Sequence, residues 1–201
     1  ISMKKIVSFI VVAAVTSVAF AQKLDRSKRP DAGIAPEIKL GKIEEFTLEN
    51  GLKVFVVENH KLPKVAYSLS LNIDPVLEGD MAGYLDVTGQ LMERGTETRT
   101  KQQLDQEIDF IGARLSTSSY GIYGGALKKH QNKLLEIMSD VLLHSNFKQE
   151  ELEKVKKQIV AGIASSKDDP DAIASNVKAA LTYGKNHPYG EIPTEKTVEN
   201  I

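Results

Sequence analysis

Few side chains of this 201-residue chain could bind a metal ion or activate water. The chain contains no Cys, which excludes a disulfide framework, a thiolate zinc site and a Cys nucleophile. No two of its four His residues have the spacing with which a single helix holds a metal ion, and a site assembled from them would need several ligands to converge. We therefore expect each to be a surface or locally hydrogen-bonded side chain. They are His60, His130, His144 and His187.

The stretch from Ala82 to Arg94 predicts a helix on which Asp86 and Gln90 lie one turn apart on the same face. Asp86 could ligate a metal, but Gln90 is a poor zinc ligand, and Gly89 has no side chain to accept a proton from a metal-bound water. Gly89 also weakens a helix interior by about 1 kcal/mol relative to Ala. We predict that Asp86 and Gln90 form a hydrogen bond between positions i and i+4, or face a groove without chemistry.

The elements around this helix are predicted from apolar periodicity and turn residues. Asn50-Gly51 favours a hairpin with a type I′ turn, Thr100 is expected to cap a helix, and Asp168-Asp169-Pro170 is expected to end one. We expect an α+β fold in which helices pack on a mainly antiparallel sheet. The predicted strands are 43–48, 52–58, 65–73, 114–120 and 122–127, and the further helices are 101–111, 129–144, 150–166, 172–181 and a start near 194–201.

The N-terminus predicts export. Met3-Lys4-Lys5 is followed by an apolar run of about 15 residues, shorter than the roughly 20 that span a membrane, and Ala19-Phe20-Ala21 fits a signal-peptidase site. We expect a signal peptide over 1–21, in which Ile1-Ser2 are two extra leading residues, then a lead-in over 22–42. A single domain should follow over 43–201, truncated at its C-terminal end. With a net charge of −1, the composition excludes a nucleic-acid binder that depends on bulk charge.

Several short segments, in this order and spacing, resemble the insulinase/pitrilysin-like metallopeptidases, which are inverzincins. The resemblance covers about residues 43–201. The segments are Glu49-Asn50-Gly51-Leu52-Lys53-Val54, Ala82-Gly83, Arg94-Gly95-Thr96, Asp168-Asp169-Pro170 and His187-Pro188-Tyr189-Gly190.

The resemblance implies a clamshell of homologous α+β domains, with zinc on the first domain. The metal is held by an H-x-x-E-H helix and by a Glu from a later helix. Carried onto this chain, the three motif positions are Asp86, Gly89 and Gln90. The third ligand falls near Gly162, and a supporting Glu falls near Val155. The resemblance thus implies a non-catalytic member with no cofactor of its own, and zinc only on a catalytic partner or domain.

Three functions follow as expectations. The first is a non-catalytic subunit that binds peptide, or that pairs with a zinc-bearing peptidase homologue or a second homologous domain, in an exported and most simply periplasmic complex. The second is a zinc metalloendopeptidase whose active site lies outside this segment, and the third is a structural or assembly subunit. We expect no nucleic-acid partner, and we do not expect this chain alone to be an enzyme.

Overall fold

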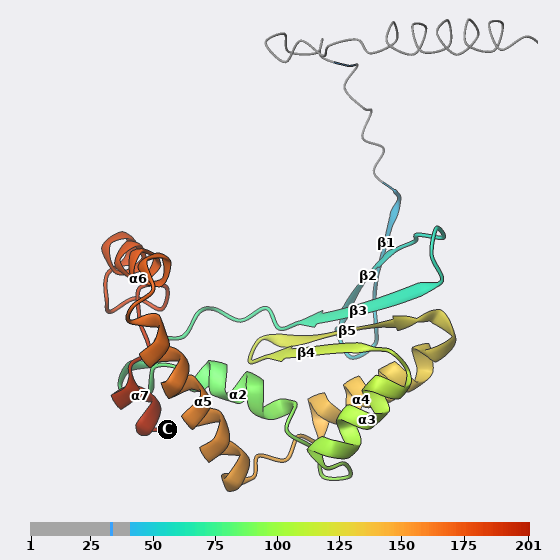
Figure 1. Cartoon of the computed structure of the whole chain (residues 1–201). Helices are drawn as coiled ribbons and strands as arrows, with labels where there is room; N and C mark the ends of the chain where they lie inside the picture. The colour runs from blue at the N-terminus through green and yellow to red at the C-terminus, as the bar shows by residue number, and fades with distance from the viewer. Residues whose placement is uncertain (1–32, 34–40) are drawn as a thin grey trace, which may run out of the picture. The chain divides into compact units, whose positions relative to one another are not determined.

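A computed structural model of the chain describes residue 33 and residues 41–201. The chain divides into two compact units, one ending at Glu58 and the other running from Asn59 to Ile201 (Figure 1). The predicted signal peptide over 1–21 and most of the lead-in over 22–42 lie outside the described residues. The domain expected over 43–201 therefore comprises a hairpin of the first unit and the whole second unit.

The first unit contains a hairpin of β1 (Ile43–Thr47) and β2 (Lys53–Val57), paired antiparallel as predicted. The predicted type I′ turn is wrong, because that turn needs a positive φ at both central residues and only Gly51 has one, at 86°. The Gly51 N–H donates to the Leu48 carbonyl at 2.9 Å, and the Asn50 side chain accepts from Leu52 N–H at 3.1 Å. A three-residue loop that places Gly51 in the left-handed region is therefore formed.

The second unit is built on a three-stranded antiparallel sheet in the order β3-β5-β4. The strands are β3 (Lys64–Ser70), β4 (Arg114–Ser118) and β5 (Gly121–Leu127). β3 ends three residues before the predicted Ile73. The reason is the length of its partner: β5 begins at Gly121, and the Leu71 N–H makes a last bond to the Tyr120 carbonyl at 2.7 Å.

The helices agree with the predicted order, with shifted ends. Thr100 caps α3, as predicted, and the structure adds a capping box with Gln103. α6 begins at Pro170, two residues earlier than predicted, because the Asp169 side chain accepts from the N–H groups of Asp171 and Ala172. The helices are η1 (Gly79–Met81), α2 (Tyr84–Met92), α3 (Lys101–Phe110), η2 (Lys128–His130), α4 (Gln131–Leu143), α5 (Gln149–Ser166), α6 (Pro170–Tyr183) and α7 (Glu195–Glu199).

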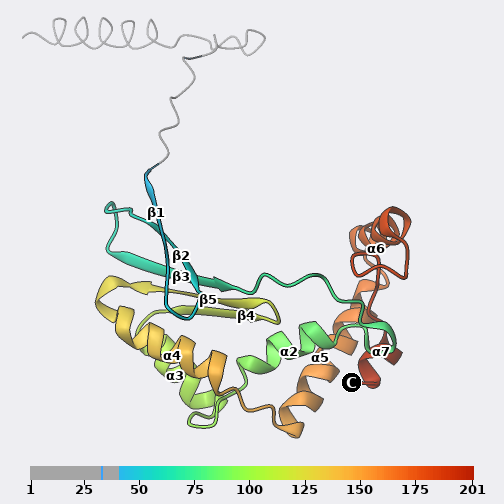
Figure 2. The ribbon, with the colours of Figure 1, turned by 180° about the vertical axis from the view of Figure 1, so that it is seen from behind.

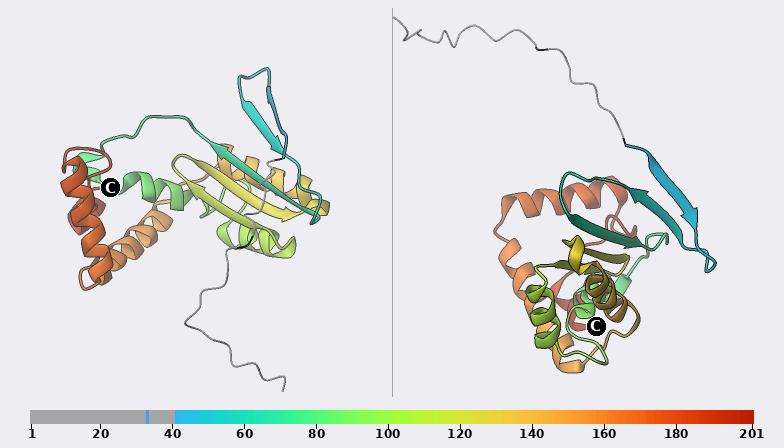
Figure 3. Two further views of the ribbon diagram at one scale, coloured as in Figure 1. Left: turned by 90° about the horizontal axis from the view of Figure 1, so that it is seen from above. Right: turned by 90° about the vertical axis from the view of Figure 1, so that its right-hand side faces the viewer.

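One face of the sheet is covered by α3 and α4, as Figure 2 and the view from above in Figure 3 show. The fully buried side chains at this interface include Leu104 from α3 and Leu134, Ile137 and Val141 from α4. They pack against Ile122 on β5. The expected α+β architecture, with helices on an antiparallel sheet, is confirmed.

A second, smaller core joins α2 to α5. Val87 and Leu91 of α2 pack against Val155 of α5, which is fully buried. Because α2 also contacts β4, it lies between the sheet and α5 and is fixed on both sides. Across residues 41–201, no helix combines the length and the apolar character needed to cross a membrane.

Candidate functional site

The N-terminus of α2, which carries the three motif positions, is held by two acidic side chains. The Glu78 carboxylate accepts from the N–H groups of Gly83 at 2.8 Å and Leu85 at 3.1 Å, where a helix has unpaired donors and a positive dipole end. Glu191 in turn accepts from the N–H groups of Glu78 and Gly79, at 2.8 and 2.6 Å. These bonds fix the start of α2 against the segment that precedes α7.

The predicted bond between Asp86 and Gln90 is confirmed. Gln90 Nε2 donates to Asp86 Oδ2 at 2.9 Å across one helical turn. Asp86 is exposed and Gln90 is half-buried, whereas Val87 and Leu91 of the same helix are buried. The carboxylate of Asp86 is thus engaged by a neutral amide in the position where a metal ligand would be needed.

Gly89 has a packing role that the sequence did not reveal. A Cβ atom at this position would lie 2.8 Å from Ser118 Cα and 3.0 Å from Ser119 N, so α2 and the end of β4 touch through their backbones. The Thr117 hydroxyl reinforces the contact by donating to the Gly89 carbonyl at 2.7 Å. Without a shift of β4, no side chain fits at the position that corresponds to the water-activating Glu.

Glu93 is a further residue of this site that the sequence reasoning missed. Its Oε1 atom accepts from the Thr117 backbone N–H at 2.8 Å, which ties the end of α2 to β4. The available signal was its spacing, because Glu93 follows Gly89 by four residues and so shares its helix face. On the other side of α2, the Arg94 guanidinium donates to the Gln158 side chain of α5 at 2.8 Å.

The two distal positions differ in their surroundings. Val155 is fully buried in the core between α2 and α5, where a charged side chain would have no partner. Gly162 is exposed, and a Cβ added there would meet no atom within 4 Å. Among residues 33 and 41–201, no three His, Cys, Asp or Glu side chains are grouped so that they could hold a metal ion.

Next to Asp86 lies a mainly apolar groove of about 870 Å³. Ile159 and Ile163 of α5 form one wall, and Ile173 and Val177 of α6 form another. Ile173 and Val177 are about half exposed, so α6 presents an apolar stripe along this groove. The groove can receive apolar side chains.

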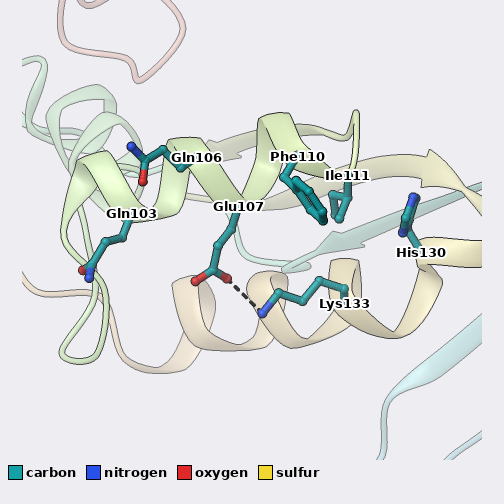
Figure 4. Close-up of a pocket in the computed structure, with 7 residues that line it drawn as sticks. All are labelled: Gln103, Gln106, Glu107, Phe110, Ile111, His130 and Lys133. Carbon is teal, nitrogen blue, oxygen red and sulfur yellow. Dashed lines mark ion pairs between the residues drawn. The ribbon is translucent and has the colours of Figure 1, made fainter.

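The four His residues are spread along the chain, and His144 and His187 have local partners as expected. The Nδ1 atom of His144 lies 3.5 Å from Asp140 Oδ1, and the Nδ1 atom of His187 accepts from the Tyr189 N–H at 3.2 Å. His60 lies in the connection between β2 and β3. His130 lies at one end of a hollow of about 510 Å³ between α3 and α4, opposite Gln103 (Figure 4).

The strongest electrostatic cluster lies beyond α2 and centres on Arg99. The guanidinium donates to Asp140 Oδ2 at 2.7 Å and to Glu107 Oε2 at 3.1 Å, and it also pairs with Glu136. Burial alone would raise the pKa of Asp140, but hydrogen bonds from Thr96, Arg99 and Thr98 outweigh it and the pKa is lowered. Asp140 therefore belongs to a structural ion cluster, in which its Oδ2 atom accepts hydrogen bonds from Thr96, Thr98 and Arg99.

Lys133 extends this cluster onto the hollow that contains His130. Its Nζ atom lies 2.9 Å from Glu107 Oε2, the ion pair drawn in Figure 4, and 3.1 Å from Glu136 Oε1. The hydrogen bond from Lys133 is the main cause of the lowered pKa of Glu107. Glu107 is therefore engaged by two cations and is not free to join His130 at a metal.

Comparison with known families identifies the family to which the region around α2 belongs. The sequence model of the family described as Insulinase (Peptidase family M16) matches residues 80–191, more than half of the chain. This range contains α2, the sheet strands β4 and β5, and the helices from α3 to α6. The chain belongs to the insulinase family.

Several curated relatives are similar over most of this chain. An uncharacterized zinc protease of Bacillus subtilis, YmxG, is 26% identical over 166 residues, covering 79% of this chain and 40% of that protein. An uncharacterized zinc protease of Rickettsia bellii is 29% identical over 165 residues, covering 77% of this chain and 39% of that protein. The chain thus spans about two fifths of the length of these relatives.

Solved structures share the fold. A crystal structure of a peptidase M16 inactive domain from Pseudomonas fluorescens superposes with a TM-score of 0.70 at 21% identity, covering 80% of this chain and 40% of that one. A protease from Helicobacter pylori superposes with a TM-score of 0.65 at 19% identity, covering 81% of this chain and 41% of that one. At these identities the likeness establishes the peptidase-like fold.

Proposed function

We propose that this chain is a non-catalytic peptidase-like domain that holds peptide together with a zinc-bearing homologous partner chain or domain. The proposal rests chiefly on Gly89, because the backbone contact with Ser118 leaves no room for a water-activating side chain on α2. The amide of Gln90 and the buried Val155 are consistent with it. In this reading zinc and the general base both belong to the partner.

The proposed role of the fold is to supply one wall of a peptide-binding chamber. The apolar groove beside Asp86 and the three-stranded sheet are the surfaces of this chain suited to such a wall. The apolar segment near the N-terminus supports export, and we propose a periplasmic complex on that basis. Fractionation of the producing cells tests this directly: a mature chain starting at Gln22 in the periplasmic fraction is expected, and an uncleaved chain in the cytoplasm would contradict export.

The absence of catalysis is testable on the purified chain. We expect much less than one equivalent of zinc after dialysis, measured by plasma mass spectrometry, and no peptide cleavage that chelation abolishes. A suitable positive control is a family member with an intact H-x-x-E-H helix prepared in the same way. One equivalent of tightly bound zinc together with chelator-sensitive cleavage would instead establish a metallopeptidase whose site includes other residues.

Pairing is testable with such a catalytic homologue from the same cell. We expect the two proteins to co-purify and the KM of the partner for an extended peptide to fall when this chain is added, because a second wall adds peptide contacts. If the partner cleaves the peptide with the same KM and kcat in the absence of this chain, the peptide-holding role is wrong.

A further inference from the structure

The strands of the second unit and the segments next to them carry positive charges but no acidic residue. Residues 59–73, which contain β3, and residues 112–135, which contain β4 and β5, include no Asp or Glu. The whole chain has nearly equal numbers of acidic and basic residues, 27 and 26, so its charge is unevenly distributed. The basic residues of these two segments are Lys61, Lys64, Arg114, Lys128, Lys129 and Lys133.

The topology of the sheet brings these charges to one end. β3 and β4 both run antiparallel to β5, so β3 and β4 begin where β5 ends (Figure 1). Lys64 pairs in register with Leu127, and Arg114 is the first residue of β4. The Lys128 N–H donates to the Pro63 carbonyl at 2.8 Å, which brings the connection before β3 against the turn after β5. All of these residues belong to the second unit.

Five of the six charges have no acidic partner among residues 41–201. Lys133 is the exception, because it pairs with Glu107 and Glu136. The first turn of α4 contains no acidic residue and its N-terminus has no side-chain cap, so the positive end of the helix dipole adds to the charge. The five unpaired side chains are exposed and together form the basic end of the sheet: Lys61, Lys64, Arg114, Lys128 and Lys129.

Two large apolar side chains are exposed at the same end. Leu62, in the connection before β3, is 61% exposed. Phe110, at the end of α3, is 86% exposed and lies toward the same end of the hollow between α3 and α4 as His130 (Figure 4). Asp109 precedes Phe110 and offsets one of the five charges, so the surface remains positive. Exposed apolar side chains among unpaired cations are typical of a surface that lies on a lipid bilayer.

We propose that the basic end of the sheet, together with Leu62 and Phe110, binds the surface of an anionic phospholipid bilayer. Lipid phosphates supply many negative charges in one plane, which suits cations spread over the ends of three strands. The two apolar side chains can enter the layer below the headgroups, whereas an acidic polypeptide would leave them in water. The export proposed above brings the chain to a membrane, and the peptide-holding function is not needed for this binding.

The chain contains no Trp, so a single introduced Trp reports from a chosen site. Phe110→Trp retains an aromatic ring at the proposed surface, and Leu181→Trp, at a position on α6 that is 82% exposed, is the control. The chain is used as isolated from its producing cells, with vesicles of phosphatidylcholine containing about 30% phosphatidylglycerol. We expect the emission of Phe110→Trp to shift to shorter wavelength and that of Leu181→Trp to stay unchanged.

Salt and neutral lipid test the electrostatic part of the binding. About 1 M NaCl should abolish the shift of Phe110→Trp, because it shortens the screening length to about 3 Å. Vesicles of phosphatidylcholine alone should leave the emission unchanged. An equal shift with neutral and anionic vesicles would overturn the proposal, because the cations would then contribute nothing.

Charge removal tests the cations themselves. In the Phe110→Trp background, Lys128→Gln with Lys129→Gln removes two charges. The lipid concentration at half of the full shift should then rise about 25-fold, about fivefold for each charge. Lys178→Gln with Lys185→Gln removes the same charge from α6 and the turn after it, and should leave that concentration nearly unchanged. An equal rise with the two pairs would overturn the proposal, because net charge alone would explain the binding.

The apolar part is tested at Leu62. Leu62→Ser in the Phe110→Trp background should raise the lipid concentration at half of the full shift about three- to tenfold, because a Leu side chain gains free energy when it leaves water. An unchanged concentration would overturn the insertion of Leu62.

An acidic polypeptide is the competing occupant, and polyglutamate is its probe. Absence of any shift with anionic vesicles would overturn the proposal, and a shift with polyglutamate instead would assign this surface to an acidic protein. Neither result bears on the zinc content, the cleavage assay or the KM of a partner, which test the proposed function separately.

Discussion

At Gly89 a hydrogen atom stands where any larger side chain would collide with the backbone of Ser118. Helix propensity alone favours Ala over Gly in a helix interior by about 1 kcal/mol. The collision opposes this preference, since overpacking a tight contact costs about 1–3 kcal/mol. Helix propensity and overpacking therefore change the free energy of unfolding in opposite directions at Gly89.

Gly89→Ala should lower the free energy of unfolding by about 1–2 kcal/mol, because the strain at Ser118 exceeds the propensity gain. Urea denaturation monitored by circular dichroism measures it. Gly162→Ala is the matched control in α5: its new Cβ meets no atom within 4 Å, so stability should rise by about 0.5–1 kcal/mol. Equal shifts in the two variants would show that the contact at Ser118 is unimportant.

Residue-level predictions succeeded where the partners are close in sequence. The Asp86–Gln90 bond follows from helical spacing alone, and the helix was predictable from its apolar residues. The contact between Gly89 and β4 joins residues such as Gly89 and Thr117 that are 28 positions apart. Its existence depends on how α2 lies on the sheet, which no local pattern specifies.

Among the elements, α3 and α4 are joined by the ion cluster around Arg99. Asp140 accepts from Thr96 Oγ1 at 2.6 Å and from Arg99 at 2.7 Å, so this carboxylate links α4 to the turn after α2. Both Thr96 and Asp140 are almost completely buried. The cluster therefore helps to fix the C-terminal end of α2 relative to the helix layer.

Stability should fall in acid because the pKa values of Asp140, Glu107 and Glu136 are lowered in the folded chain. A carboxylate with a lowered folded pKa stabilises the fold above its unfolded pKa, near 4, and that contribution is lost as the pH falls through the folded pKa. Asp140→Asn should cost about 1–3 kcal/mol at pH 7 and progressively less below about pH 4. Urea midpoints between pH 7 and pH 3 measure this convergence.

The exposed Asp105 supplies the control for that series. It pairs with Lys101 one turn away on α3, with half of its side chain in solvent. Exposed pairs contribute about 0–1 kcal/mol, so Asp105→Asn should leave the pH dependence nearly unchanged. A parallel pH profile for Asp140→Asn and the unaltered chain would show that Asp140 does not contribute to acid sensitivity.

The types of the elements were predictable from apolar periodicity and from turn and capping residues. The residues at which the elements end depended on the strands and helices that pair with them. The cap at Thr100 and the break at Pro170 were correctly located because both act through neighbouring residues. β3 stops at Ser70 because β5 begins at its partner Gly121, and this limit is therefore set by a strand distant in the sequence. The type of turn at Asn50-Gly51 depended on loop length, which dipeptide preference did not fix.

For the whole molecule, the division into two units implies that the two units differ in stability. The β1–β2 hairpin has only two strands, and Ile43, Phe55 and Val57 are each about 60% exposed or more. An isolated two-stranded hairpin is marginally stable in water. The second unit instead buries two apolar clusters.

Native-state hydrogen exchange should therefore show fast exchange in β1 and β2 and slow exchange in β5 and α4. The difference in protection should exceed tenfold, about 1.4 kcal/mol, because local opening of the hairpin exposes little buried surface. The comparison is internal to one sample and needs no variant. Equal protection in the hairpin and in α4 would mean that the hairpin opens only with the rest of the chain.

The contact between Gly89 and Ser118 also limits how the sequence can change over generations. A carboxylate could be accommodated at position 89 only after β4 had moved, and that movement would break the bonds from Thr117 to Gly89 and Glu93. Each intermediate would lose stability, and folded proteins have little stability in reserve. The packing at this glycine therefore means that no single substitution can place a carboxylate at position 89 without a loss of stability.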